Sequence, residues 1–409
     1  MDTGTIKNEL RKKILEQIDL SNDISDETVN EIIDSVLMGD KRLFVLSPDK
    51  KKKLKGELFD SLRRLDIIQE YLEDQEVTEI MVNGKDNIFI ERKGKVIKID
   101  SCFDSEEKLG DVIRQIVSGV NRNVNESSPI ADARLKNGAR VNVVMAPVAL
   151  NGPILTIRRF PDKPITMEKL IKWGTITKEA ADFVRLLVAA GYNICISGGT
   201  SSGKTTLLNA VSGFIPKDQR VITIEDSAEL QLQGLSNLVR LETKNTGGEE
   251  STDITIRDLI RAALRMRPDR IIVGEVRGKE AMDMLQCMNT GHDGSMSTGH
   301  ANSAADMLSR LESMVLMGVE IPLLAIRSQI GSGIDIIIHT ARMRDRKRRI
   351  LEITEVTGYG EEGYGLNTLF EFEEESTSTR EQVVGSLVRK NELIDTRKLR
   401  SAGLQKYSC

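Results

Sequence analysis

One glycine-rich segment constrains this chain more than any other part of its sequence. Residues 198–205 match the pattern GxxxxGK(S/T); the apolar run Ile194–Ser197 precedes them, and a helix-like stretch, Thr206–Val211, follows. In such a loop, backbone N–H groups surround phosphate oxygens, and the positive end of the following helix faces them. The segment therefore predicts a phosphate-binding loop between a strand and a helix of an α/β domain. Its expected binding residues are Gly198, Gly199, Thr200, Ser201, Ser202, Gly203, Lys204, Thr205 and Thr206.

Two acidic residues follow apolar runs elsewhere in the same half of the chain. Glu275 comes just after Arg270–Val273, and Glu225 comes directly after Val221–Ile224. Because the carboxyl ends of parallel strands meet at one edge of a sheet, we expect both carboxylates near the glycine-rich loop. Glu275 is the candidate for polarising an attacking water. Lys204 is expected to neutralise the β- and γ-phosphates of a nucleotide.

The predicted metal is Mg²⁺, held by the Thr205 hydroxyl and, through water, by Glu225. Asp226 could share those waters. A competing interpretation makes Asp226 a helix N-cap and Glu229, three residues later, the second half of a capping box. The two interpretations can coexist.

Two of the three histidines, His292 and His300, lie in the glycine-dense segment 290–302, which is interpreted as a loop. Imidazoles placed near a phosphate could sense the γ-phosphate and report it to a neighbour. The competing interpretation is a buried, hydrogen-bonded histidine. Their spacing would permit metal ligation, but no third ligand accompanies them, so a zinc site is not expected.

The chain divides by pattern into helical, mixed and α/β parts. A charged helical stretch is followed near Val77 by strand-like runs, a helix around 108–120 and further strands, which indicate an α+β domain. Two prolines, Pro161 and Pro164, mark a linker. Apolar runs alternating with helices then indicate buried parallel strands. The predicted parts are a helical region 1–70, an α+β domain 71–160, a linker 161–175, an α/β domain 176–358 and a tail 359–409.

Composition excludes some functions. Lys plus Arg is 58 and Asp plus Glu is 62, a net charge of -4, so the chain as a whole does not indicate nucleic-acid binding. No run reaches the roughly 18 apolar residues of a membrane span. The lysine-rich run 50–55 is interpreted as a solvated helix face. The basic run 342–349 could contact nucleic acid or anionic lipid, but Asp345 within it favours an exposed turn.

A transition state of phosphoryl transfer often receives a positive charge from elsewhere in the protein. The α+β domain offers four arginines on predicted strands, and the competing interpretation for each is a surface residue. The candidates are Arg134, Arg140, Arg158 and Arg159.

Four elements, in this order along the chain, resemble the signature set of the type II/type IV secretion ATPase superfamily. They are the glycine-rich loop 198–205, the acidic box 223–226, the segment 273–277 and the histidine box 290–300. Three further segments are similar to the CpaF (TadA-type) branch, whose members drive Tad/Flp pilus assembly. These segments are 125–135, 138–142 and 155–160.

The resemblance implies a cytoplasmic homo-hexameric ATPase that lies at the inner face of the cell membrane and acts on inner-membrane platform proteins. It implies a RecA-like P-loop domain preceded by a smaller α+β domain and an N-terminal helical region, with ATP and Mg²⁺ as ligands and no membrane span. Hydrolysis would rotate one domain against the other. The alternative from another class is a RecA-like nucleic-acid translocase.

The resemblance also implies roles for individual residues. Glu275, Glu225 and Lys204 would be catalytic, and His292 and His300 would form the histidine box at the nucleotide. Arg140 and Arg158 occupy positions where family members present arginines to nucleotide, whereas Arg134 and Arg159 match less well.

Overall fold

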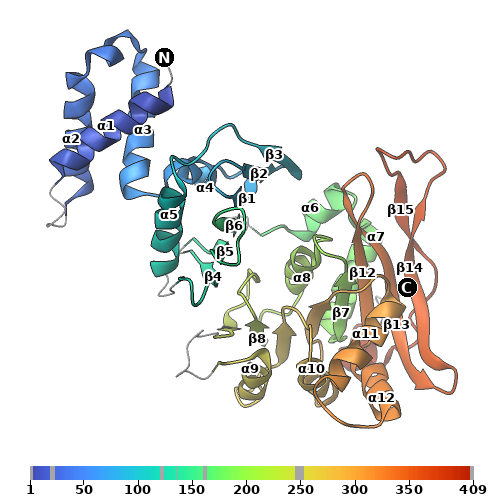
Figure 1. Ribbon diagram of the computed structural model, residues 1–409. Helices are drawn as coiled ribbons and strands as arrows, with labels where there is room; N and C mark the ends of the chain where they lie inside the picture. The colour runs from blue at the N-terminus through green and yellow to red at the C-terminus, as the bar shows by residue number, and fades with distance from the viewer. Residues whose placement is uncertain are drawn as a thin grey trace. The chain divides into compact units, whose positions relative to one another are not determined.

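The chain forms two compact units, Met1–Pro161 and Asp162–Cys409, which are described separately below (Figure 1). The computed structural model describes residues 3–18, 24–119, 124–135, 137–159, 164–244 and 253–405. Part of the predicted linker, residues 161–163, lies outside the described residues, as does Val120 at the end of a predicted helix.

The first unit begins with a bundle of helices around its own small core. Ser25 and Ser47 cap two of these helices by accepting hydrogen bonds from Thr28 N and Lys50 N. Leu10, Ile33 and Leu58 are fully buried between the helices. The elements are α1 (Thr3–Gln17), α2 (Asp26–Gly39), the short 3₁₀ helix η1 (Lys41–Val45) and α3 (Pro48–Arg63), followed by η2 (Asp66–Ile68) and α4 (Gln69–Glu73).

An antiparallel sheet forms the rest of this unit. Among the described residues it has six strands in the order β3-β2-β1-β6-β5-β4. Alternating residues such as Ile80 and Val82 point into a core that α5 covers with Leu109, Ile113 and Ile116. The elements are β1 (Val77–Asn83), β2 (Ile88–Arg92), β3 (Lys95–Lys98), α5 (Glu106–Ser118), β4 (Ile130–Arg134), β5 (Arg140–Val144) and β6 (Ile154–Arg158).

The second unit is built on a sheet with the order β15-β14-β13-β12-β7-β11-β10-β8-β9 in the described residues. The strands from β12 to β9 are parallel, and β13 to β15 continue antiparallel. The strands are β7 (Ile194–Gly198), β8 (Arg220–Glu225), β9 (Asn237–Glu242), β10 (Arg270–Val273), β11 (Met296–Gly299), β12 (Ile336–Arg342), β13 (Arg348–Gly360), β14 (Gly363–Glu374) and β15 (Gly385–Arg389).

Helices cover both faces of this sheet and give two separate apolar cores. One core gathers residues of α6, α7, α8 and α13, and the other gathers residues of α9, α10, α11 and α12. This three-layer arrangement is the doubly wound one expected from strands alternating with helices. The helices are α6 (Met167–Lys172), α7 (Lys178–Ala190), α8 (Lys204–Ser212), α9 (Ile256–Ala263), α10 (Ala281–Asn289), α11 (Ala304–Leu316), α12 (Leu323–Gly333) and α13 (Arg397–Ser401).

Two segments differ from the sequence-based expectation. The predicted loop 290–302 contains β11, a fully buried strand between β7 and β10. The predicted tail after residue 358 contains all of β14 and β15, which extend the same sheet. In β14, Phe370 and Phe372 alternate with exposed glutamates, the two-residue period of a strand. Within the described residues, no helix combines the length and the apolarity that crossing a bilayer requires.

Candidate functional site

The glycine-rich loop, residues 198–205, joins the end of β7 to the start of α8. Ser201 and Gly203 have positive φ values of 58° and 96°, a conformation that turns successive backbone N–H groups to one side. Gly198 packs so tightly that an added Cβ would lie 2.2 Å from the carbonyl oxygen of Thr340 on β12. The Thr340 hydroxyl in turn donates to the carbonyl of Ser202 at 3.2 Å. The loop is therefore held in shape by β12, its neighbour in the sheet.

Lys204 bends back over the loop that precedes it. Its ammonium donates to the carbonyl oxygens of Gly198 and Gly199, at 3.1 and 3.0 Å, and its side chain is almost fully buried. Thr205 follows it in the first turn of α8. The ammonium thus lies above the loop that the motif predicts to bind phosphate.

The imidazole of His300 lies between the Lys204 ammonium and the Glu275 carboxylate. His300 lies 3.4 Å from the Lys204 ammonium through Nδ1 and 2.8 Å from Glu275 Oε1 through Nε2. Arg277 donates twice to the other oxygen of Glu275, at 2.9 and 2.6 Å. Burial and the Lys204 charge lower the pKa of His300, which favours the neutral imidazole. The structure therefore brings together three residues predicted from separate motifs.

These residues meet because their strands end at one edge. Lys204 follows β7, His300 follows β11, and Glu275 comes just after β10, three neighbouring parallel strands. Thr298 of β11 donates to the carbonyl of Gly274 at 2.7 Å and so fixes the backbone beside Glu275.

Glu225 ends β8 at the same edge and is almost fully buried. Its Oε2 accepts hydrogen bonds from Glu229 N and Leu230 N, at 2.7 and 2.9 Å, whereas Oε1 has no hydrogen-bond partner among the described residues. Burial raises the pKa of this carboxyl to about 7. The helix and capping box proposed for Asp226 and Glu229 are absent from this described segment, because the Glu225 carboxylate binds the backbone of an irregular loop instead.

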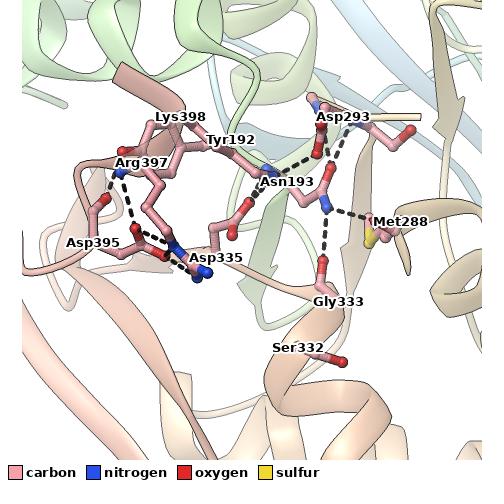
Figure 2. Close-up of polar contacts among 12 residues, drawn as sticks. Tyr192, Asn193, Met288, Asp293, Ser332, Gly333, Asp335, Asp395, Arg397 and Lys398 are labelled. Carbon is pink, nitrogen blue, oxygen red and sulfur yellow. Dashed lines mark hydrogen bonds and ion pairs between the residues drawn. The ribbon is translucent and has the colours of Figure 1, made fainter. Parts of the chain in front are cut away.

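His292 does not join this group. It precedes β11, whereas His300 follows it, so β11 separates the two imidazoles by about 13 Å of strand. The segment after His292 lies beside Asn193, whose side-chain oxygen accepts from Gly294 N and Ser295 N at 2.9 and 3.1 Å (Figure 2). The histidine box therefore contributes one imidazole to the carboxyl edge of the sheet.

Two contacts near the loop were not anticipated from the sequence. The third histidine, His339 on β12, is buried, and its Nδ1 lies 2.9 Å from the Ser197 hydroxyl. Arg348, from the basic run 342–349, donates to the carbonyl of Ser201 at 3.0 Å. The five-pair register between β12 and β7 brings His339 to the loop, and the pairing of β13 with β12 brings Arg348 there. No local sequence signal reveals either pairing.

Other arginines of the basic run also have partners inside the second unit. Arg344 pairs with Glu374 on β14. Arg349 is buried, donates to the carbonyl of Val383 at 2.7 Å and lies over the Phe372 ring. The run therefore serves the packing of the β12–β13 turn to a large extent.

The candidate arginines of the first unit lie on adjacent strands. Arg140 is directly opposite Arg134 on β4 and Arg158 on β6, so the three share one face of the sheet. Arg134 donates to Gly138 O at 3.2 Å. Arg159 is used internally, since it donates to the backbone oxygens of Asp74 and Val77.

Comparisons with known proteins agree with this architecture. A family model described as type II/IV secretion system protein matches residues 62–376. The conjugal transfer protein TrbB of Rhizobium radiobacter is 33% identical over 309 residues, 75% of this chain and 91% of that protein. A putative conjugal transfer protein of Mycobacterium tuberculosis is 32% identical over 293 residues, 70% of this chain and 83% of that one.

Among solved structures, the pilus retraction motor PilT with bound ADP is 20% identical, with a TM-score of 0.50 over 84% of this chain and 87% of that one. At this identity the likeness concerns the fold alone. It confirms the predicted α/β architecture, a RecA-like domain accompanied by a smaller domain. From the extent of the family match, the chain belongs to the type II/IV secretion system protein family.

Proposed function

We propose that this chain is an ATP-hydrolysing motor that powers a type IV secretion or pilus-assembly machine. The observation that carries the proposal is the connection Lys204–His300–Glu275 at the end of three parallel strands. It links the residue expected to meet the γ-phosphate with the carboxylate expected to polarise water. The names of the relatives, conjugal transfer proteins and a pilus motor, support the choice of machine.

In this proposal, Lys204 exchanges its two carbonyl partners for phosphate oxygens when nucleotide enters the loop. The residues around it fit Mg²⁺, because the Thr205 hydroxyl is in the first turn of α8 and Glu225 has a buried oxygen with no hydrogen-bond partner among the described residues. When bound, Mg²⁺ would neutralise charge on the phosphates. Thr205 would hold it directly and Glu225 through water.

Glu275 would orient the attacking water. Arg277 donates twice to one of its carboxylate oxygens and His300 lies 2.8 Å from the other, so these two side chains flank Glu275 before substrate arrives. His300 faces Lys204 on its other side and would therefore change its hydrogen bonds when Lys204 moves to the γ-phosphate. The contacts of Glu275 would therefore depend on whether a γ-phosphate is bound at Lys204.

The finer parts of the proposal extend the family resemblance. We propose a homo-hexamer in the cytoplasm at the inner face of the membrane, acting on platform proteins of a Tad/Flp-type pilus. Arg140 and Arg158 are proposed as nucleotide ligands, and hydrolysis as the cause of domain rotation. Arg140 on β5 lies directly opposite Arg158 on β6, so both side chains could contact one anion.

The test is Mg-ATP turnover per subunit at rising protein concentration, for wild type and Glu275→Gln, with and without single-stranded DNA. We expect turnover per subunit to rise with protein concentration as the ring assembles. It should fall at least a hundredfold in Glu275→Gln and should not change when DNA is added. Glu320→Gln, at an exposed position, is the matched control and should behave as wild type. Turnover that is independent of concentration but stimulated by DNA would favour a nucleic-acid translocase instead.

A further inference from the structure

The corner where α2 passes into α3 exposes apolar side chains to solvent. Met38, Phe44 and Val45 are 75%, 64% and 87% exposed, although Leu43 between them is buried in the helical core. The short η1 helix thus turns one apolar residue inward and its two successors outward. Exposed side chains of this size, grouped within eight residues, indicate a contact surface rather than packing within the unit.

Basic residues surround this apolar tip. Residues 38–55 contain seven basic and two acidic side chains, a net charge of +5. Lys41, Lys50, Lys52 and Lys53 are exposed, and none has a carboxylate partner among the described residues. The Lys51 ammonium lies 5.7 Å from the centre of the Phe44 ring, which places the start of α3 beside the tip.

The lysines are placed where they weaken the helix that carries them. Ser47 caps α3 and accepts from Lys50 N, so Lys50 occupies the third position of the helix, where a glutamate would complete a capping box. Cations in the first turn also oppose the helix dipole. Local stability therefore disfavours this lysine cluster, and an anionic partner would account for its presence.

We propose that this corner, residues 38–53, docks on the surface of an anionic lipid bilayer. Phe44, Val45 and Met38 would enter the boundary between headgroups and acyl chains, while the lysines contact lipid phosphates. A bilayer fits this corner, because exposed apolar side chains flanked by exposed lysines complement both the acyl region and the anionic headgroups of such a surface. The proposal gives the proposed motor a membrane contact, but vesicle binding needs no ATP, so the two can fail separately.

The first test measures co-sedimentation of the full chain, without nucleotide, with vesicles of phosphatidylcholine alone or mixed with phosphatidylglycerol. We expect binding to the mixed vesicles that weakens as salt rises. Phe44→Ser/Val45→Ser should lower the partition coefficient about tenfold or more. Leu150→Ser is the matched control, because Leu150 is 90% exposed in the same unit and has no lysine run beside it.

The second test changes the charge without harming the fold. Lys50→Glu/Lys52→Glu completes the capping box and suits the helix dipole, so we expect an unchanged or higher Tm together with at least tenfold weaker binding to the mixed vesicles. Lys169→Glu/Lys172→Glu, two exposed lysines of the second unit, makes the same charge change and should leave binding within about twofold of wild type. Reduced binding with retained stability separates a docking role from a structural one.

Three results would overturn the proposal. One is that wild type does not co-sediment with the mixed vesicles at low salt. Another is equal loss of binding in the corner variants and in their controls. The third is charge-dependent binding to poly-glutamate without binding to vesicles, which would assign the corner to an acidic protein surface.

Discussion

The two ends of the parallel strands in the second unit differ in how completely a buried polar side chain at each end is hydrogen-bonded. At the carboxyl edge, Ser201 and Gly203 hold the left-handed backbone conformation, and Glu225 keeps an oxygen without a partner in the described residues. At the amino edge, the Asn193 side chain uses both donors and accepts twice, bonding to Met288 O, Gly333 O, Gly294 N and Ser295 N (Figure 2). The unsatisfied Glu225 oxygen thus lies where chemistry is proposed, and the fully bonded Asn193 amide lies where strands are anchored.

The amino edge also fixes the C-terminal helix. The Lys398 ammonium lies 2.7 Å from Asp335 and 2.8 Å from Asp293, and the Tyr192 hydroxyl donates to Asp395 O at 2.6 Å (Figure 2). Burial raises the pKa of Asp335 in spite of the Lys398 charge. This edge therefore holds β7, β12 and α13 in one network.

The largest effect is expected for Lys204→Ala at the carboxyl edge. It should lower ATP turnover on the order of a thousandfold, because the positive charge proposed for the γ-phosphate is lost. The Tm should change little, since the Lys204 ammonium contacts loop carbonyls and His300 at the sheet edge rather than the apolar cores. Steady-state turnover and a thermal melt on the same sample check this, and a large fall in Tm would show that this edge is structural too.

The opposite result is expected for Asn193→Ala at the amino edge. Four buried backbone groups would lose their partner, so unfolding should cost about 3 to 5 kcal/mol less. Denaturant titration measures this free energy. Asn391→Ala, which removes one exposed hydrogen bond, is the control and should cost about 1 kcal/mol. Equal losses in the two variants would remove the distinction between the edges.

The two histidines of the predicted box provide a direct comparison. His300→Ala should lower turnover by about a hundredfold, because the link between Lys204 and Glu275 is broken. His292→Ala should leave turnover within about threefold of wild type, because His292 lies at the amino edge. Comparable losses of turnover would contradict the separation of the edges by β11.

The smallest effect concerns pH and His339. Burial lowers the pKa of this imidazole, so its contribution to stability is complete above about pH 6.5 and is lost as the pH falls below that value. Wild type should lose about 1 kcal/mol more stability than His339→Asn between pH 7.5 and 5.5. Denaturant titrations at the two pH values measure the difference. If the difference in unfolding free energy between wild type and His339→Asn is the same at pH 5.5 as at pH 7.5, the imidazole stays hydrogen-bonded when charged.

Much of the second unit could be predicted because apolar runs and a glycine-rich motif are local signals. The runs expected as strands form β7, β8, β10 and β12, and the rule that parallel strands end at one edge gathers Glu275 and Glu225 there. The α/β fold is confirmed. The roles of the residues stay predictions until the activities are measured.

What could not be predicted depends on long-range pairing. The β11 sequence Met-Ser-Thr-Gly has no apolar run, and it is buried because neighbouring backbone oxygens accept its hydroxyls, as Gly274 O does for Thr298. Without that strand, His292 and His300 look like neighbours in one loop. The contact of His339 with the loop likewise follows from the pairing of β12 with β7, and that of Arg348 follows from the pairing of β13 with β12.

The central placement of β11 has a consequence for how this chain can vary. From Asn193 to Gly198 along β7, and from Ser295 to His300 along β11, the chain takes the same five steps between the two edges. Inserting or deleting one residue in either segment would shift one end by about 3.3 Å and turn its side chains to the other face. We therefore expect natural variants to accept conservative substitutions in these segments more readily than a change in their length.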